Sequence, residues 1–323
     1  MTEPASPDAP RTSPAWEAWT IRGVAALALV VAVVLATLAW GAVVHGHPAY
    51  AVMLAVTVLL AAITLWRWRR ARRAGGAALL GLRVLGIFAT LAWVALIAWL
   101  KPFTATEPAL SAMKSDGAVS VTESATQIVM RPTGETSGVA LAFQPGARVD
   151  PRAYAAVLRP LVEAGHPVVV TKQPLGIAFL AMGGFEQAKA TVLEAGTWVV
   201  GGHSLGGTVA AIEADTEYPT DQSGPAGLLL YGSYPAGDMT SYEGAVLSVS
   251  GSEDGLATPA DIEASRADLP DDALYWVVEG GSHAQFGAYG DQPGDGEPTV
   301  TDDEAREQIA AASLAFLDGP LEG

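Results

Sequence analysis

Ser204 lies at the centre of the stretch TWVVGGHSLGGTVAAIEA, with a glycine two residues away on either side. The stretch begins with β-branched residues that favour a strand and ends with helix formers. Gly202 and Gly206 fit a sharp strand-to-helix turn, where larger side chains would clash with neighbouring backbone. Such a turn holds the hydroxyl at a helix N-terminus, where free N–H groups favour developing negative charge. The pattern therefore predicts that Ser204 is a nucleophile.

A glycine-rich turn between a strand and a helix could instead hold a phosphate. This segment lacks the lysine of a P-loop and the glycine spacing of a dinucleotide-binding turn. We therefore favour the nucleophile interpretation over a phosphate site.

A serine nucleophile needs a base, and the base needs an acid that orients it. His283 is the only histidine after Ser204, so it is the predicted base. The acid is expected after the strand predicted at Ala245–Ser250, which runs into GSEDGLATP and offers Glu253 and Asp254. We favour Asp254 because an Asp-Gly pair suits a tight turn, and Glu253 remains the alternative.

Acyl transfer also needs two N–H groups that stabilise an oxyanion. One is expected from Leu205, directly after the nucleophile. The other is expected from Ala147, in the PGAR loop after the strand predicted at Val139–Phe143, where Gly146 keeps the backbone accessible. Pro145-Gly146 could alternatively be a simple turn.

The elements that must position these residues alternate between strands and helices from residue 118 to residue 318. The strands are continuous apolar runs, which is typical of a mostly parallel sheet covered by helices on both faces. The prediction is an α/β, doubly wound domain, in which ligands bind outside the carboxyl ends of the strands. The expected strands are residues 119–123, 127–131, 139–143, 167–171, 197–200, 227–231, 245–250 and 274–278.

The segments FQPGARVDPRAY, GGHSLGG, GSEDGLATPADI and GGSHAQFGAYGDQPGDG together resemble the α/β-hydrolase family, in particular its small dienelactone-hydrolase-like bacterial branch. The resemblance implies an esterase-type acyl hydrolase with Ser204, Asp254 and His283 as its triad. A dienelactone hydrolase proper has a cysteine nucleophile, and this chain has no cysteine, so a lactone substrate is not implied. No long insertion interrupts the strands, which favours an open site.

The loop GAYGDQPGDGEP contains Asp291 and Asp295, which could hold Ca²⁺. It lacks the regular ligand spacing of a calcium loop, so we expect a structured loop beside His283. No cofactor and no metal are expected.

The first third of the chain has a different character. Residues 1–20 are rich in Pro, Ser and Ala and are expected to form a disordered tail. Three apolar runs follow at Ile21–Val44, Ala49–Trp66 and Leu79–Leu100, each long enough to cross a ~30 Å hydrocarbon layer as a helix. A cleaved signal peptide or buried helices of a soluble protein fit these runs less well. Residues 21–100 are thus a predicted transmembrane region, 101–117 a linker and 118–318 the hydrolase domain.

The connection RWRRARRAGG, Arg67–Gly76, carries five arginines. Positive loops stay in the cytoplasm, so the third span would deliver the catalytic domain to the outer face of the plasma membrane. The formal charge is −16, and only three of the 34 acidic residues precede residue 101. This acidic domain should repel nucleic acid.

These features predict a membrane-anchored serine esterase whose partners are the lipid bilayer and a small ester-like substrate. An acyltransferase or peptidase on the same fold, and a membrane-tethered binding module without turnover, remain alternatives. The sequence gives no signal for an oligomeric state.

Overall fold

The computed structural model describes residues 15–67, 77–217, 224–319 and 321. The chain forms two compact units, one of Met1–Val43 and Ala49–Lys101 and the other of Val44–Pro48 and Pro102–Gly323. Of the disordered tail expected at residues 1–20, residues 1–14 lie outside the described residues, and residues 15–20 are helical. Residues 68–76 of the arginine-rich connection also lie outside the described residues.

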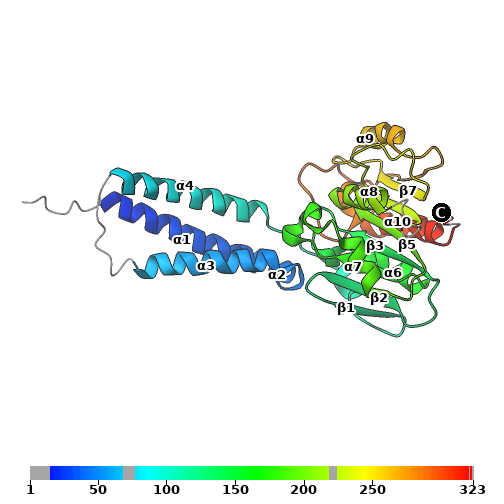
Figure 1. Cartoon of the computed structure of the whole chain (residues 1–323), viewed down its shortest axis with the longest axis horizontal. Coiled ribbons are helices and arrows are strands. Elements are labelled where there is room, and N and C mark those ends of the chain that lie inside the picture. The colour runs from blue at the N-terminus through cyan, green and yellow to red at the C-terminus, as the bar shows by residue number, and fades with distance from the viewer. Residues whose placement is uncertain (1–14, 68–76, 218–223, 320, 322–323) are drawn as a thin grey trace, which may run out of the picture. The chain divides into compact units, whose positions relative to one another are not determined.

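The first unit is helical (Figure 1). Its helices are α1 (Ala15–Leu38), most of α2 (Trp40–His45) and of α3 (Pro48–Arg67), and α4 (Ala77–Trp99), while residues 44–48 belong to the second unit. Three of its segments are long and apolar enough to be candidate membrane spans, Trp16–Leu38, Pro48–Arg67 and Ala78–Trp99. The second and third nearly coincide with the apolar runs at 49–66 and 79–100, whereas the first begins five residues before Ile21 and ends six residues before Val44.

Helix α1 begins at Ala15, six residues before the apolar run at Ile21. The added turn contains Glu17, which is 1 % exposed and pairs with Arg83 of α4 at 2.8 Å. Further along the unit, the Tyr50 hydroxyl donates to the carbonyl oxygen of Ile97 at 2.9 Å. Glu17 and Tyr50 thus each have a polar partner within the unit, although Oε2 of Glu17 has none among the described residues.

The second unit is built on one eight-stranded sheet with the strand order β1-β2-β4-β3-β5-β6-β7-β8. Strand β2 is antiparallel to both β1 and β4, and all other neighbours are parallel. The mostly parallel sheet predicted from the continuous apolar runs is therefore confirmed. The strands are β1 (Val119–Glu123), β2 (Gln127–Pro132), β3 (Val139–Gln144), β4 (Val168–Thr171), β5 (Thr197–His203), β6 (Gly227–Tyr231), β7 (Ala245–Gly251) and β8 (Leu274–Val278).

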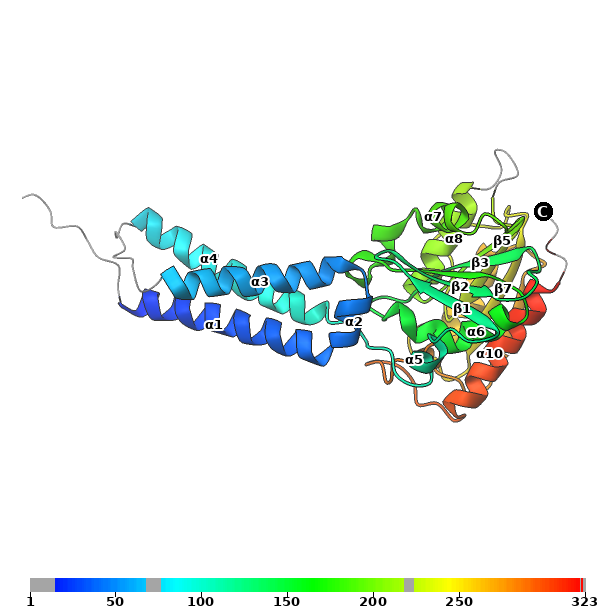
Figure 2. The ribbon, with the colours of Figure 1, turned by 90° about the horizontal axis from the view of Figure 1, so that it is seen from below.

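Helices cover both faces of the sheet, each over its own apolar core. Figure 2 shows α7 and α8 on one face and α5, α6 and α10 on the other. The α-helices of this unit are α5 (Ala109–Ala112), α6 (Ala155–Glu163), α7 (Gly184–Thr191), α8 (Leu205–Glu217), α9 (Pro259–Ser265) and α10 (Asp302–Leu317). The 3-10 turns are η2 (Pro151–Tyr154), η3 (Pro174–Gly176), η4 (Ala178–Ala181), η5 (Arg266–Asp268) and η6 (His283–Phe286).

The segment 102–117, where a linker is predicted, packs within the second unit. Phe103 forms a parallel bridge with Val149, next to the loop that follows β3. Ala105 and Ala109 are buried, and α5 lies against α6. The hydrolase unit therefore includes contacts that begin well before residue 118, and the domain boundary at 118 stays a prediction.

Candidate active site

Ser204 lies between the end of β5 and the start of α8, at the carboxyl edge of the sheet. Its φ angle is +52°, a left-handed conformation that costs a non-glycine residue free energy. The surrounding backbone holds this conformation. The Ser204 N–H donates to the carbonyl oxygen of Tyr231 at 3.0 Å, and the Ser204 carbonyl accepts from the hydroxyl of Ser233 at 2.7 Å and from the N–H of Gly207 at 2.9 Å.

The two glycines that flank the turn have no room for a side chain. A Cβ on Gly202 would lie 2.4 Å from the carbonyl carbon of Gly206. A Cβ on Gly206 would lie 2.1 Å from the carbonyl oxygen of Gln144, at the end of β3. Because these neighbours are backbone atoms that cannot move aside, the glycine spacing is a steric requirement of the turn.

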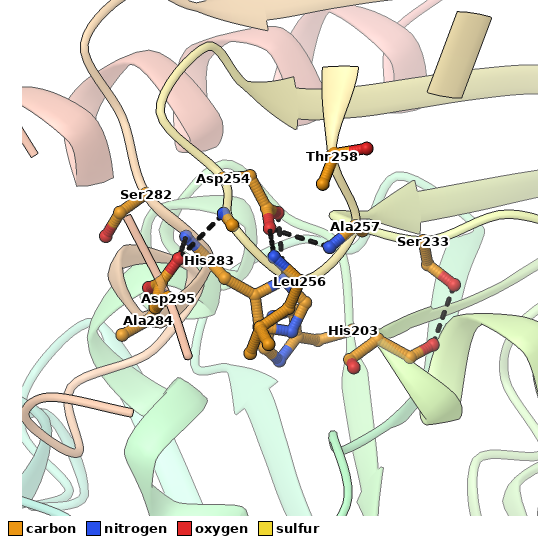
Figure 3. A network of polar contacts seen from close by, with 12 residues as sticks. His203, Ser233, Asp254, Leu256, Ala257, Thr258, Ser282, His283, Ala284 and Asp295 are labelled. Atoms are coloured by element: carbon orange, nitrogen blue, oxygen red, sulfur yellow. Dashed lines mark hydrogen bonds and ion pairs between the residues drawn. The ribbon is translucent and has the colours of Figure 1, made fainter. Parts of the chain in front are cut away.

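The carboxylate of Asp254 binds the imidazole of His283. Oδ2 of Asp254 lies 2.8 Å from Nδ1 of His283, and both side chains are almost completely buried (Figure 3). Asp254 follows β7 and His283 follows β8, so two loops at the same edge of the sheet bring them together. A carboxylate on Nδ1 favours the tautomer with its proton there, which leaves Nε2 as the acceptor that a base requires.

Backbone N–H groups hold the Asp254 carboxylate in place. Its Oδ1 accepts from the N–H of Leu256 at 2.8 Å and from that of Ala257 at 2.7 Å. The neighbouring Glu253 is exposed, and its carboxylate accepts from the hydroxyl of Ser252. Of the two carboxylates that the sequence offers, Asp254 is the one that contacts His283.

Nε2 of His283 is buried and has no hydrogen-bond partner among the residues that the structure describes. The hydrogen bond from Ser204 Oγ to this nitrogen is therefore not formed here. The His283 ring packs instead against the ring of His203, which precedes the serine, with 4.4 Å between ring centroids. Hydrogen bonds between a nucleophile and its base are often long in the absence of substrate, and they tighten when substrate binds.

The two N–H groups expected to stabilise an oxyanion lie on adjacent segments. Leu205 is the first residue of α8, and Ala147 follows β3, which pairs directly with β5. Within the described ranges, neither N–H donates to a protein acceptor. Because Gly206 touches the backbone of Gln144 and Pro145, the start of α8 and the loop that carries Ala147 lie side by side.

The model of one protein family, the "Alpha/beta hydrolase family", matches residues 140–307, more than half of the chain. This chain belongs to the α/β-hydrolase family. No curated protein matches it.

Solved structures also resemble this α/β hydrolase. A predicted CIB-like hydrolase from Thermoplasma acidophilum has 16 % sequence identity and a TM-score of 0.46, over 62 % of this chain and 98 % of its own. An α/β serine hydrolase homologue from Coxiella burnetii has 16 % identity and a TM-score of 0.43, over 61 % and 98 %. An α/β serine hydrolase without lid from Xanthomonas campestris has 13 % identity and a TM-score of 0.44, over 64 % and 98 %.

Sequence reasoning missed a buried chain of hydrogen bonds in this hydrolase, which runs from the loop after β3 through Tyr154 to the end of β5. The N–H of Gly146 donates to the hydroxyl of Tyr154 at 2.9 Å, and that hydroxyl lies 2.8 Å from Nδ1 of His203. Burial, and then the nearby imidazole of His283, hold the pKa of His203 well below its usual value. His203 lies inside the glycine motif and could have been noticed there, whereas nothing in the sequence singles out Tyr154.

Asp295 ties together the two loops that carry Asp254 and His283. Its Oδ1 accepts from the N–H groups of Gly255 at 3.1 Å and His283 at 3.0 Å, and its Oδ2 accepts from that of Ala284 at 2.8 Å. Burial by itself would raise the pKa of Asp295, but its backbone N–H bonds outweigh that effect and lower it. The carboxylate therefore acts as a loop anchor, and the described residues contain no cluster able to hold a metal ion.

Proposed function

We propose that this α/β hydrolase is a membrane-anchored serine esterase that works through an acyl-enzyme. The contact between Asp254 and His283 is the observation that supports this function most strongly, because a buried carboxylate on Nδ1 prepares Nε2 to accept a proton. Strained Ser204, at the same edge of the sheet, supplies the nucleophile.

In the proposed reaction the Ser204 oxygen attacks the ester carbonyl, and its proton passes to Nε2 of His283. Asp254 keeps the resulting imidazolium oriented and stabilises its charge. The N–H groups of Leu205 and Ala147 stabilise the oxyanion of the tetrahedral intermediate. His283 then protonates the leaving alcohol, and water, activated by the same imidazole, releases the acid and regenerates Ser204.

A fluorophosphonate probe tests the nucleophile, because it phosphonylates an activated serine and releases fluoride. The wild-type chain should be labelled and Ser204→Ala should not. Thr208→Ala is a suitable control, since Thr208 lies on α8 and its hydroxyl only bonds the carbonyl oxygen of Tyr234. Labelling of both the wild type and Ser204→Ala, or of neither, would contradict the proposal.

The missing bond between Ser204 and His283 favours a second candidate, a tethered binding module without turnover. A panel of p-nitrophenyl esters of increasing acyl length separates the two. Serine-dependent hydrolysis of any of them supports the esterase, and its absence across the panel supports the binding module. Addition of acceptor alcohols and of peptide substrates then distinguishes an esterase from an acyltransferase or a peptidase.

Within the α/β-hydrolase family, we place the protein in the dienelactone-hydrolase-like branch, with a serine nucleophile in place of cysteine. We also propose that the hydrolase domain begins at residue 118. The protein would lie in the plasma membrane with its catalytic unit outside the cytoplasm. The three candidate spans support the anchor. A reporter fused after Leu317 that is active only outside the cytoplasm should be active, and activity of a cytoplasm-only reporter would reverse the orientation.

A further inference from the structure

An uncharged segment after β4 exposes three large apolar side chains within four residues. Phe179 is 48 % exposed, Leu180 55 % and Met182 43 %. We refer to these three residues as the apolar ridge. Single exposed apolar residues are ordinary on a protein surface, whereas a contiguous group indicates a binding surface. The ridge stands out further because the unit around it is strongly acidic.

The ridge segment is bonded to the loop that carries the oxyanion donor Ala147. At its start, the carbonyl oxygen of Gly176 accepts from the N–H of Arg148 at 2.7 Å. At its end, the carbonyl oxygen of Ala181 accepts from the side-chain amide of Gln144 at 3.2 Å. These bonds hold the ridge as a fixed flank of the candidate active site.

The chain enters the hydrolase unit at the same loop. The N–H of Phe103 donates to the carbonyl oxygen of Arg148 at 2.8 Å, and the N–H of Asp150 donates to that of Phe103 at 2.9 Å. Phe103 lies four residues after Trp99, the end of the third candidate span. An extended chain covers at most about 3.6 Å per residue, so the loop begins within about 14 Å of the point where the chain would leave a bilayer.

A second attachment lies beside the ridge segment. The turn Val44–Pro48, between the first two candidate spans, belongs to the hydrolase unit. In this unit Nδ1 of His45 lies 3.3 Å from a carboxylate oxygen of Glu123, and the same oxygen accepts from Nζ of Lys172 at 2.9 Å. Lys172 directly follows β4, so the turn that joins the first two candidate spans contacts the hydrolase unit at the carboxyl edge of the sheet.

We propose that the apolar ridge inserts into the outer leaflet of the bilayer and that the candidate active site takes long-chain acyl esters of lipids from it. This inference rests on the proposed esterase function. Apolar insertion is the expected mode of attachment, because the acidic unit is repelled by anionic headgroups. A flank of the site that lies in the leaflet would let an acyl chain reach Ser204 without crossing water.

The test uses the full chain in phosphatidylcholine vesicles. A long-chain fluorogenic ester dissolved in the bilayer reports lipid hydrolysis, and p-nitrophenyl acetate in the water reports the integrity of the catalytic centre. The ratio of the two rates should fall at least 10-fold in the double variant Phe179→Ser/Leu180→Ser. Leu193→Ser is the matched control, because Leu193 is 82 % exposed and precedes β5 at the opposite edge of the sheet.

An unchanged ratio in the double variant would contradict the inference while leaving the esterase in place. If the wild type hydrolyses neither ester, the proposed function fails, and a second measurement still decides where the ridge lies. The chain has no cysteine, so a fluorophore can be attached at Leu180→Cys or at Leu193→Cys alone. Lipid-borne quenchers should quench the first label strongly and the second weakly, and equal quenching would overturn the insertion.

Discussion

Nδ1 of His283 lies 2.8 Å from Oδ2 of Asp254, although 29 residues separate them in the chain. The two loops that carry them follow neighbouring parallel strands, β7 and β8. Because parallel strands end at the same edge of a sheet, their loops meet there without any long connection. Of the two adjacent carboxylates, Asp254 contacts the imidazole and Glu253 does not.

Asp254→Asn should lower kcat for a p-nitrophenyl ester by about 10³- to 10⁴-fold, because an amide at this position favours the wrong tautomer of His283. Glu253→Gln is the matched control, since Glu253 is exposed and bonds only Ser252 through its side chain. Its kcat should stay within about twofold of the wild type. Steady-state kinetics of both variants check the prediction, and the reverse ranking would assign the acid to Glu253.

Gly206→Ala should destabilise the hydrolase unit by about 3 kcal/mol and abolish probe labelling, because the added Cβ would overlap the carbonyl oxygen of Gln144. Gly183→Ala is the control, since a Cβ there meets no atom within 4 Å. Thermal unfolding of detergent-solubilised protein measures the difference. Equal melting temperatures for the two variants would contradict the steric account of the motif.

Asp295→Asn should lower the melting temperature and reduce kcat, because an amide cannot accept from all the N–H groups that anchor the Asp254 and His283 loops. Asp291→Asn, in the same loop but with an exposed carboxylate, should change neither. The pKa of Asp295 is lowered in the folded state. Its stabilisation is therefore present above the ordinary aspartate pKa of about 3.9 and is lost as the pH falls further.

The variant should consequently lose less stability than the wild type as the pH falls below about 4. Melting temperatures measured across that range check the sign. A wild type and an Asp295→Asn variant with parallel pH profiles would show that the carboxylate is not a charged anchor.

His203 should make the hydrolase less stable as the pH falls below about 6.5, because only the unfolded chain takes up a proton at this imidazole. The pKa of His203 is lowered in the folded state, so stability rises with pH across this window, by up to about 1.4 kcal/mol per pH unit. His203→Asn should flatten this dependence. Melting temperatures between pH 5 and pH 7 test it, and identical slopes in the two proteins would refute a buried neutral His203.

Much of the fold could be predicted from the sequence because its signals are local. Apolar runs of four to six residues indicate buried strands. The glycines around Ser204 indicate a strand-to-helix turn. The strands found at Val119–Glu123, Gly227–Tyr231 and Leu274–Val278 have the predicted limits. Strand β5 extends to His203, beyond the predicted end at Val200, because glycines 201 and 202 continue the pairing with β3 and β6.

The sequence by itself determined the α/β pattern, the nucleophile candidate and the order of serine, acid and histidine, since each depends on residue type and spacing along the chain. Tertiary structure alone decided which of Glu253 and Asp254 contacts the imidazole, because adjacent residues differ only in how the turn after β7 aims them. It also decided the link from Gly146 through Tyr154 to His203, whose members come from three separate segments. Such contacts depend on how strands and loops pack in space, and no local pattern records that packing.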